Sequence, residues 1–222
     1  MQYLPAIEIE TGTDPEATVI WLHGLGADGN DFAPIVPELR LPQAMPVRFI
    51  FPHAPAIPVT VNGGFVMPAW YDISAMEIDR EIDTAGLIQS AQKIEALIER
   101  EYQRGMQSSR IIVAGFSQGG AVAYQVALSH SRPLAGLLAM STYFATAESV
   151  DYSAANLHLP IQIQHGLYDP VVPEILGQKA SRLLTHKGYL VNYQTYPMEH
   201  GVCPEQISDI GLWLGHNLRR SA

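Results

Sequence analysis

Residues 110–130 read RIIVAGFSQGGAVAYQVALSH, so an aliphatic run, a serine between glycines and a helix-like pattern follow one another directly. The aliphatic run predicts a strand over 110–114, and the later pattern predicts a helix over 119–130. Ser117 lies at the turn between them, within the G-x-S-x-G motif of residues 115–119. At such a turn the serine takes strained backbone angles, and the flanking glycines let neighbouring backbone approach without Cβ clashes. The segment therefore predicts a nucleophile elbow.

The same alternation of strand-like and helical segments recurs along the chain. It predicts an α/β fold with one mostly parallel, twisted sheet and helices on both faces. Further strands are expected at 18–22, 47–51, 134–141, 161–164 and 190–196, with an N-terminal edge strand around Ile7 and Ile9. Helices are expected at about 77–104, where Ser74 and Glu77 form an S-x-x-E capping box, and at 174–186 and 205–219. No linker divides the sequence, so residues 1–222 are expected to form a single domain.

Composition excludes several classes of protein. The chain has 222 residues, of which 47% are hydrophobic and 16% charged, which is too apolar for intrinsic disorder. Its net charge of −9 argues against nucleic acid and anionic lipid as partners, because both require a basic surface. No apolar run approaches the roughly 18 residues of a membrane span. We therefore expect a small-molecule partner, no nucleic acid and no stable membrane insertion.

The N-terminal segment and the cysteine content indicate the compartment. No Lys or Arg precedes Arg40, which is the opposite of the charge that a signal peptide carries. Cys203 is the only cysteine, so no internal disulfide can form. Its closeness to His200 suggests a thiol nucleophile or a metal ligand, but a small buried side chain is favoured because no second cysteine or His-x-x-x-His pattern accompanies it. We expect a cytoplasmic protein without a metal.

A nucleophilic serine needs a base and a carboxylate that orients the base. Asp169 follows the strand predicted at 161–164, and His200 follows the last predicted strand. The carboxyl ends of parallel strands meet at one edge of a sheet, and the chain order Ser, Asp, His is typical of this arrangement. The sequence therefore predicts Ser117, Asp169 and His200 as catalytic residues. His165 stays open as an alternative base.

Two further carboxylates, Glu174 and Asp151, compete with Asp169 as the acid, although neither lies at a junction between strand and loop. Hydrolysis also requires N–H donors for the oxyanion. One is expected from Gln118, the residue after the nucleophile, and the other from Leu25 in the loop after the strand at 18–22. These two amides are the predicted oxyanion hole.

The loop at residues 24–29 also fits the dinucleotide pattern G-x-G-x-x-G. A nicotinamide-dependent oxidoreductase that uses Gly24-Leu25-Gly26-Ala27-Asp28-Gly29 is therefore a remote alternative. Against it, Asp28 and Asp31 would face the pyrophosphate, and prolines interrupt the helix that should follow.

The stretch from Pro52 to Pro68 reads as a long surface loop, because it is rich in proline and contains Gly63-Gly64. Long loops in compact domains are often functional. Its apolar side chains are expected to cover an acyl chain, together with side chains near the predicted nucleophile and acid. The predicted substrate-binding residues are Ile57, Val59, Phe65, Met67, Trp70, Val171 and Val172.

Motifs spread over nearly the whole chain share one pattern with a known family. They are residues 22–26, 51–55 with 58–60, 70–72, 115–120, 165–173 and 198–200. Together they resemble the acyl-protein thioesterase and bacterial carboxylesterase branch of the α/β-hydrolases, and Gly63-Gly64 is similar to the carboxylesterase members. The resemblance implies an α/β-hydrolase fold, a Ser-Asp-His triad, an oxyanion hole from Leu25 and Gln118, no cofactor, a cytoplasmic location and hydrolysis of carboxylic esters or thioesters.

Fewer than about twenty residues separate the strands predicted at 134–141 and 161–164, so no separate lid domain fits between them. Such an open site favours small substrates. The hypothesis is a serine carboxylesterase that cleaves short- to medium-chain esters through an acyl-enzyme. Acyl-protein thioesterase or lysophospholipase activity with the same triad is the alternative, and a binding protein without catalysis is another. An exposed apolar rim would support a weak homodimer.

Overall fold

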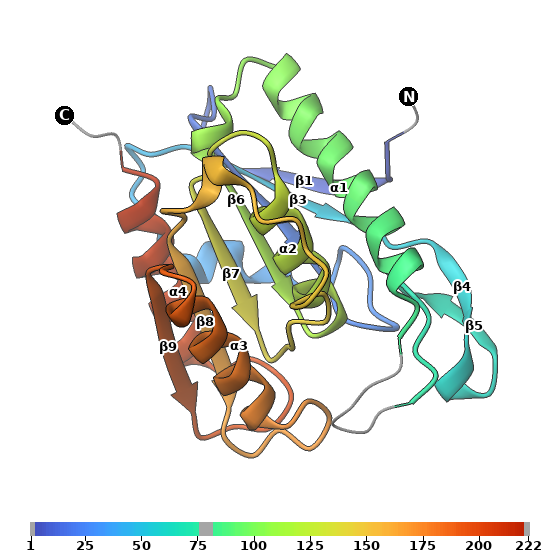
Figure 1. Ribbon diagram of the computed structural model, residues 1–222. Coiled ribbons are helices and arrows are strands. Elements are labelled where there is room, and N and C mark those ends of the chain that lie inside the picture. Colours follow the sequence, from blue (N-terminus) through green and yellow to red (C-terminus); the bar gives the residue numbers. More distant parts are fainter. Residues whose placement is uncertain (1–2, 76–81, 220–222) are drawn as a thin grey trace.

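A seven-stranded sheet forms the centre of the computed structural model (Figure 1), which describes residues 3–75 and 82–219. The strand order is β1-β3-β2-β6-β7-β8-β9. Only the pair of β1 and β3 is antiparallel; the other neighbours in this sheet are parallel. The strands are β1 (Ala6–Glu10), β2 (Ala17–Leu22), β3 (Val47–Pro52), β6 (Ile111–Phe116), β7 (Gly136–Met140), β8 (Ile161–Gly166) and β9 (Val191–Tyr196). The predicted strands and the N-terminal edge strand are confirmed to within about two residues.

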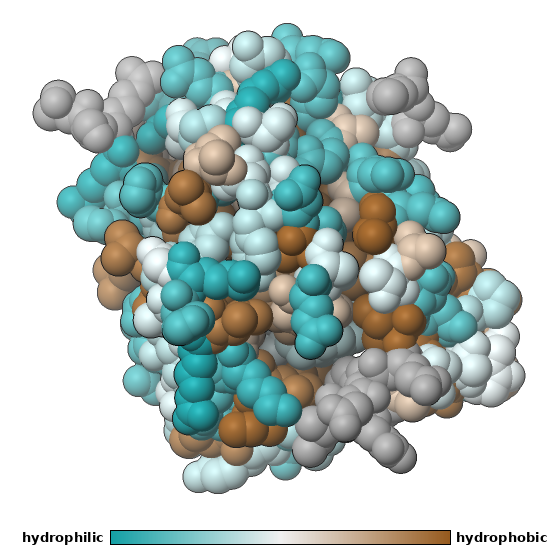
Figure 2. Space-filling model, viewed as in Figure 1, coloured by the Kyte–Doolittle hydropathy of each residue, from teal (hydrophilic) through white to brown (hydrophobic). Residues whose placement is uncertain are grey.

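Helices cover both faces of this sheet. α1 (Thr84–Gln103), α2 (Gln118–Ser129) and α3 (Glu174–His186) pack on one face. α4 (Pro204–Asn217) and a 3₁₀ segment at Ala33–Leu39 pack on the other face. α3 buries apolar side chains such as Leu176 and Leu184, while hydrophilic side chains cover its outer surface (Figure 2). Central strands such as β2 are buried throughout, which explains their continuous apolar sequence.

The first long helix begins later than the sequence predicts. It was expected from about residue 77, but α1 starts at Thr84, with Asp83 as N-cap accepting a hydrogen bond from the Gly86 amide. Ile82 instead forms a β-bridge with Ile73, and the Asp83 amide donates to the Asp72 carbonyl. These contacts hold residues 82 and 83 in a non-helical conformation. Glu77 of the expected capping box lies outside the described residues.

The stretch from Pro52 to Pro68, expected as an irregular loop, contains a β-hairpin. β4 (Ala56–Val59) pairs antiparallel with β5 (Phe65–Pro68), and the turn uses Gly63 and Gly64 at φ angles of 68° and 77°. The prediction of an irregular loop was wrong because proline is excluded from central strands but is tolerated in edge strands. Both strands of a two-stranded ribbon are edges, so Pro58 and Pro68 can turn their ring nitrogens away from the partner strand.

No lid domain interrupts the sheet. Residues 141–160, between β7 and β8, hold turns and a short 3₁₀ segment at Ala154–Asn156. In the part of the chain that the structure describes, no helix combines the length and the apolar character needed to cross a bilayer. The predicted fold class is confirmed, including helices on both faces and the absence of a separate lid.

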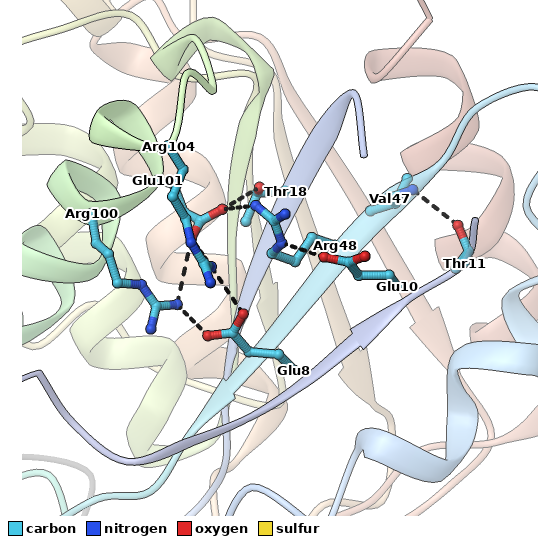
Figure 3. Close-up of polar contacts among 9 residues, drawn as sticks. All are labelled: Glu8, Glu10, Thr11, Thr18, Val47, Arg48, Arg100, Glu101 and Arg104. Carbon is cyan, nitrogen blue, oxygen red and sulfur yellow. Dashed lines mark hydrogen bonds and ion pairs between the residues drawn. The ribbon is translucent and has the colours of Figure 1, made fainter. Parts of the chain in front are cut away.

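An ion-pair cluster joins the end of α1 to the sheet (Figure 3). The Glu101 side chain is fully buried and accepts hydrogen bonds from Arg48 at 2.7 Å, Arg104 at 2.9 Å and the Thr18 hydroxyl at 3.2 Å. Glu8 of β1 binds Arg104 at 2.9 Å. The cluster therefore connects α1 with β1, β2 and β3 at the end of the sheet where β2 and β6 begin.

Replacing Glu101 by glutamine should lower the free energy of unfolding by about 3–5 kcal/mol, because Arg48 and Arg104 would lose their buried counter-charge. Urea denaturation followed by circular dichroism measures this. Glu99→Gln is the matched control, since Glu99 is 45% exposed and its ion pair is with the partly exposed Arg132. Its loss should stay below about 1 kcal/mol. Equal losses in both variants would contradict the assigned role of Glu101.

Candidate active site

Ser117 occupies the turn between β6 and α2 with φ of 52° and ψ of −121°, a strained conformation for a residue with a side chain. The close packing around the turn requires glycine. A Cβ on Gly115 would lie 2.3 Å from the Gly119 carbonyl oxygen, and a Cβ on Gly119 would lie 2.5 Å from the His23 carbonyl oxygen. Close packing therefore requires glycine on both sides of Ser117, as the G-x-S-x-G motif predicted.

Three side chains from separate loops meet at the carboxyl end of the parallel strands. Ser117 follows β6, Asp169 follows β8 and His200 follows β9. His200 Nε2 lies 3.0 Å from Ser117 Oγ, and His200 Nδ1 lies 2.7 Å from Asp169 Oδ2. The structure thus brings together the three residues that the sequence singled out, in one continuous hydrogen-bonded relay.

Asp169 is a buried carboxylate with several donors. Its Oδ1 accepts the amide N–H groups of Val171 at 2.9 Å and Val172 at 2.8 Å, while its Oδ2 faces His200. Burial raises the pKa of Asp169, but the hydrogen bonds from His200 and from the two amides outweigh it and hold the pKa below its usual value. The ionised carboxylate places the imidazole N–H on Nδ1, so that Nε2 faces the serine as an acceptor.

His165 lies behind this relay, not in it. Its fully buried ring donates from Nε2 to the Val172 carbonyl at 2.8 Å, and the same nitrogen lies 3.6 Å from Asp169 Oδ2. Burial lowers the pKa of His165, which keeps the ring neutral. His165 is therefore a support of the loop that carries Asp169, and His200 is the histidine in contact with Ser117.

The competing carboxylates lie elsewhere. Glu174 accepts hydrogen bonds from Gln178 and Tyr193, and Asp151 is exposed in the segment between β7 and β8. Neither contacts His200. The loop at residues 24–29 leads into the 3₁₀ segment at Ala33–Leu39, so no α-helix N-terminus follows β2 to hold a pyrophosphate. Cys203 is half-buried and precedes α4.

The predicted oxyanion donors both line the cavity beside Ser117. Within residues 3–75 and 82–219, the amides of Leu25 and Gln118 donate to no acceptor. The neighbouring amides are used, because Gly26 donates to the Pro68 carbonyl at 2.8 Å and Ala27 to the Gly24 carbonyl at 3.3 Å. Unused N–H groups beside a nucleophile suit a developing oxyanion.

His23 supports the loop that carries Leu25, a role not assigned from the sequence. Its Nδ1 donates to the Gly24 carbonyl at 2.7 Å, and its Nε2 accepts the Ala54 amide at 3.1 Å. Burial lowers the pKa of His23 despite the opposing hydrogen bond to Gly24, so the ring is neutral. The Trp70 indole N–H also donates to the His23 carbonyl at 2.8 Å.

The Gln118 side chain also has a structural role that the sequence did not predict. Its Oε1 accepts the Trp70 amide at 2.9 Å, and its Nε2 donates to the Tyr71 carbonyl at 2.6 Å. One residue therefore offers its backbone amide to the cavity and fixes the segment at 70–71 with its side chain. The Trp70-Tyr71-Asp72 motif was the available signal, but sequence alone does not indicate which side chain holds it.

The cavity beside Ser117 has a volume of about 290 Å³. Of the predicted substrate-binding residues, Val171 and Val172 line it. Ile57, Val59, Phe65, Met67 and Trp70 do not line it: Phe65 is 74% exposed to solvent in the hairpin, whereas Val59 and Trp70 are buried in the protein. The lining residues are Gly24, Leu25, Ala27, Asp31, Ile73, Phe116, Ser117, Gln118, Tyr143, Val171, Val172 and His200.

A parallel sheet with helices on both faces, a strained serine after a central strand and a histidine-carboxylate pair at the same edge define an α/β-hydrolase. A family model described as Phospholipase/Carboxylesterase matches residues 5–217. The chain belongs to this family, and it is a hydrolase that acts on esters or thioesters.

Known relatives include thioesterases. The chain is 40% identical over 217 residues to acyl-protein thioesterase 1 of Neurospora crassa, covering 93% of this chain and 89% of the relative. It is 38% identical over 213 residues to acyl-protein thioesterase 1 of Gibberella zeae, covering 91% of each. Among solved structures, acyl-protein thioesterase 2 of Zea mays matches with a TM-score of 0.84 and 26% identity over 98% of this chain and 100% of that chain. These relatives favour the thioesterase alternative over the short-chain carboxylesterase that the sequence first suggested.

Stability should fall as the pH drops below about 6.5, because burial lowers the pKa of His23 and His165. The unfolded chain then binds protons that the folded state excludes. His165→Gln should reduce this pH dependence, measured as the free energy of unfolding in urea between pH 7.5 and 5.5. The exposed His186→Gln should leave the slope unchanged. An identical slope in wild type and His165→Gln would contradict this account.

Proposed function

We propose that this chain is a serine thioesterase that hydrolyses S-acyl thioesters through Ser117, His200 and Asp169. The observation that carries the proposal is the hydrogen-bonded relay from Asp169 to His200 to Ser117, with spacings of 2.7 Å and 3.0 Å. The names of the relatives support the choice of thioesters as substrates. This hydrolysis requires water as its second substrate and no cofactor.

In the acylation step, Ser117 Oγ attacks the carbonyl carbon while its proton moves to His200 Nε2. The Asp169 carboxylate stabilises the resulting imidazolium through Nδ1. Negative charge develops on the former carbonyl oxygen, which accepts the Leu25 and Gln118 amides. The carbon–sulfur bond then breaks, and the thiol leaves with the proton from His200. In deacylation, water repeats the attack with His200 as base, which releases the carboxylic acid and restores Ser117.

The acyl chain lies against the apolar side of the cavity, formed by Ile73, Tyr143, Val171 and Val172. A hydrogen bond of 2.7 Å between the Tyr71 and Tyr143 hydroxyls fixes one wall. A volume of about 290 Å³ is at the small end for ligand sites, which are typically about 300–1,000 Å³. The cavity therefore suits short and medium acyl chains.

Hydrolysis of oxygen esters is the second candidate, because the same relay and the same cavity serve both reactions. The two differ at the leaving group. A thiol has a pKa of about 8.5, whereas an aliphatic alcohol is far less acidic and depends more on proton donation by His200. Both substrates of one acyl group pass through the same acyl-enzyme on Ser117.

Ser117→Ala should fold normally and lose about 10⁴-fold or more in thioester hydrolysis, since removal of a triad member has this effect in comparable enzymes. It should also fail to react with a fluorophosphonate probe. Ser109→Ala, an exposed serine at the opposite end of the sheet, is the control and should keep full activity and labelling. Normal turnover by Ser117→Ala would refute the proposed nucleophile.

An S-butyryl thioester and the oxygen ester of the same acid should differ in kcat/KM, with the thioester higher, because the thiol departs more easily in acylation. Their kcat values should converge if hydrolysis of the shared acyl-enzyme limits turnover. Steady-state rates of thiol and acid release measure both constants. A higher kcat/KM for the oxygen ester would favour the carboxylesterase candidate instead.

A further inference from the structure

The cavity beside Ser117 has a chemically mixed lining. Ile73, Tyr143, Val171 and Val172 are the lining residues assigned above to the acyl chain. The lining also includes the carboxylate residue Asp31 and the base His200. The leaving group must lie next to His200, because that imidazole gives it a proton.

A chain of aromatic contacts links the residue that follows Asp31 to His200. Asp31 directly precedes Phe32, which is buried. The Phe32 and Phe116 rings lie 5.5 Å apart, and the Phe116 and His200 rings lie 4.8 Å apart, measured between centroids. The Asp31 amide also donates to the Asp28 carbonyl at 3.1 Å, which fixes the turn.

Asp31 is an exposed lining residue whose charge has no ionic partner among the described residues. Among the described lining residues, no lysine or arginine accompanies it, and its carboxylate makes no ion pair or hydrogen bond within residues 3–75 and 82–219. Burial raises the pKa of the Asp31 carboxyl. Nearby His23 lowers this pKa, and the negative charge of Asp28 raises it further. By contrast, Asp28 forms hydrogen bonds with Asn30 and is not a lining residue.

We propose that Asp31 is a specificity-determining residue that selects thioesters and esters whose leaving group carries a positive charge. This inference rests on the proposed function. A cation near the scissile bond would supply the counter-charge that the protein does not place beside Asp31. An anionic leaving group would meet the same carboxylate at close range and be disfavoured.

Three S-butyryl thioesters with different leaving groups test the proposal. Thiocholine is cationic, mercaptoethanesulfonate is anionic and ethanethiol is neutral, and a disulfide reagent detects release of each. The measured quantity is the kcat/KM of the cationic substrate divided by that of the anionic one. A general loss of activity in a variant cancels in this ratio, and the neutral substrate reports its size.

Wild type should prefer the thiocholine ester, and Asp31→Asn should lower the cation-to-anion ratio by about threefold or more, as expected of one partly screened charge that acts oppositely on two substrates. Asp31→Glu keeps the charge and should keep the ratio within that threefold limit. A smaller fall in Asp31→Asn, or an equal fall in Asp31→Glu, overturns the proposal.

Asp151→Asn is the matched control, because it removes the same charge from an exposed position outside the cavity. The cation-to-anion ratio of Asp151→Asn should stay at the wild-type value. A fall as large as that in Asp31→Asn would mean that the overall charge of −9 causes the preference, and it would overturn the proposed role of Asp31. Ser117→Ala separates the two proposals. If it still releases thiol, the proposed function fails. If it is inactive while Asp31→Asn keeps the wild-type ratio, only the role of Asp31 fails.

Discussion

The backbone turn at Ser117 is the constraint on which the site depends. A positive φ at a residue with a Cβ is unfavourable, so neighbouring contacts must hold it. The Ser117 amide donates to the Met140 carbonyl at 2.9 Å, and the Thr142 hydroxyl donates to the Ser117 carbonyl at 2.6 Å. Both partners come from β7 and the residue pair that follows it, so the neighbouring strand fixes the nucleophile. The same turn starts α2 at Gln118, whose amide then faces the cavity.

Patterns local in sequence predicted the parts of the fold that depend on local chemistry. Continuous apolar runs marked the buried strands, and the glycines around Ser117 marked the elbow. The order of Ser117, Asp169 and His200 at the ends of strands predicted that they would lie close together. The hairpin at 56–68 and the start of α1 were missed because each depends on pairing between segments that no local pattern reveals: β4 with β5, and Ile73 with Ile82. The cavity wall was missed for the same reason, since Tyr143 reaches it from the loop after β7.

Charge is arranged differently at the two ends of the sheet. At the end near Glu101, a groove of about 960 Å³ is lined by several arginines, of which Arg48 is paired with Glu101 and Arg104 with Glu8. These ion pairs connect α1 to the sheet. At the catalytic end, Asp169 is paired with His200, whereas Asp31 forms no ion pair within residues 3–75 and 82–219. An exposed charge that lines a cavity acts on the substrate that enters it, and this is the physical basis of the charge selection proposed for Asp31.

Gln118 links substrate binding to catalysis through one residue. Gln118 lines the cavity beside Ser117, and its side chain holds the 70–71 segment whose continuation, Ile73, lines the same cavity. The Ser90 hydroxyl fixes the same segment from α1 by donating to the Trp70 carbonyl. Gln118 therefore connects the cavity wall that bears Ile73 to the start of α2, the helix that begins beside the nucleophile.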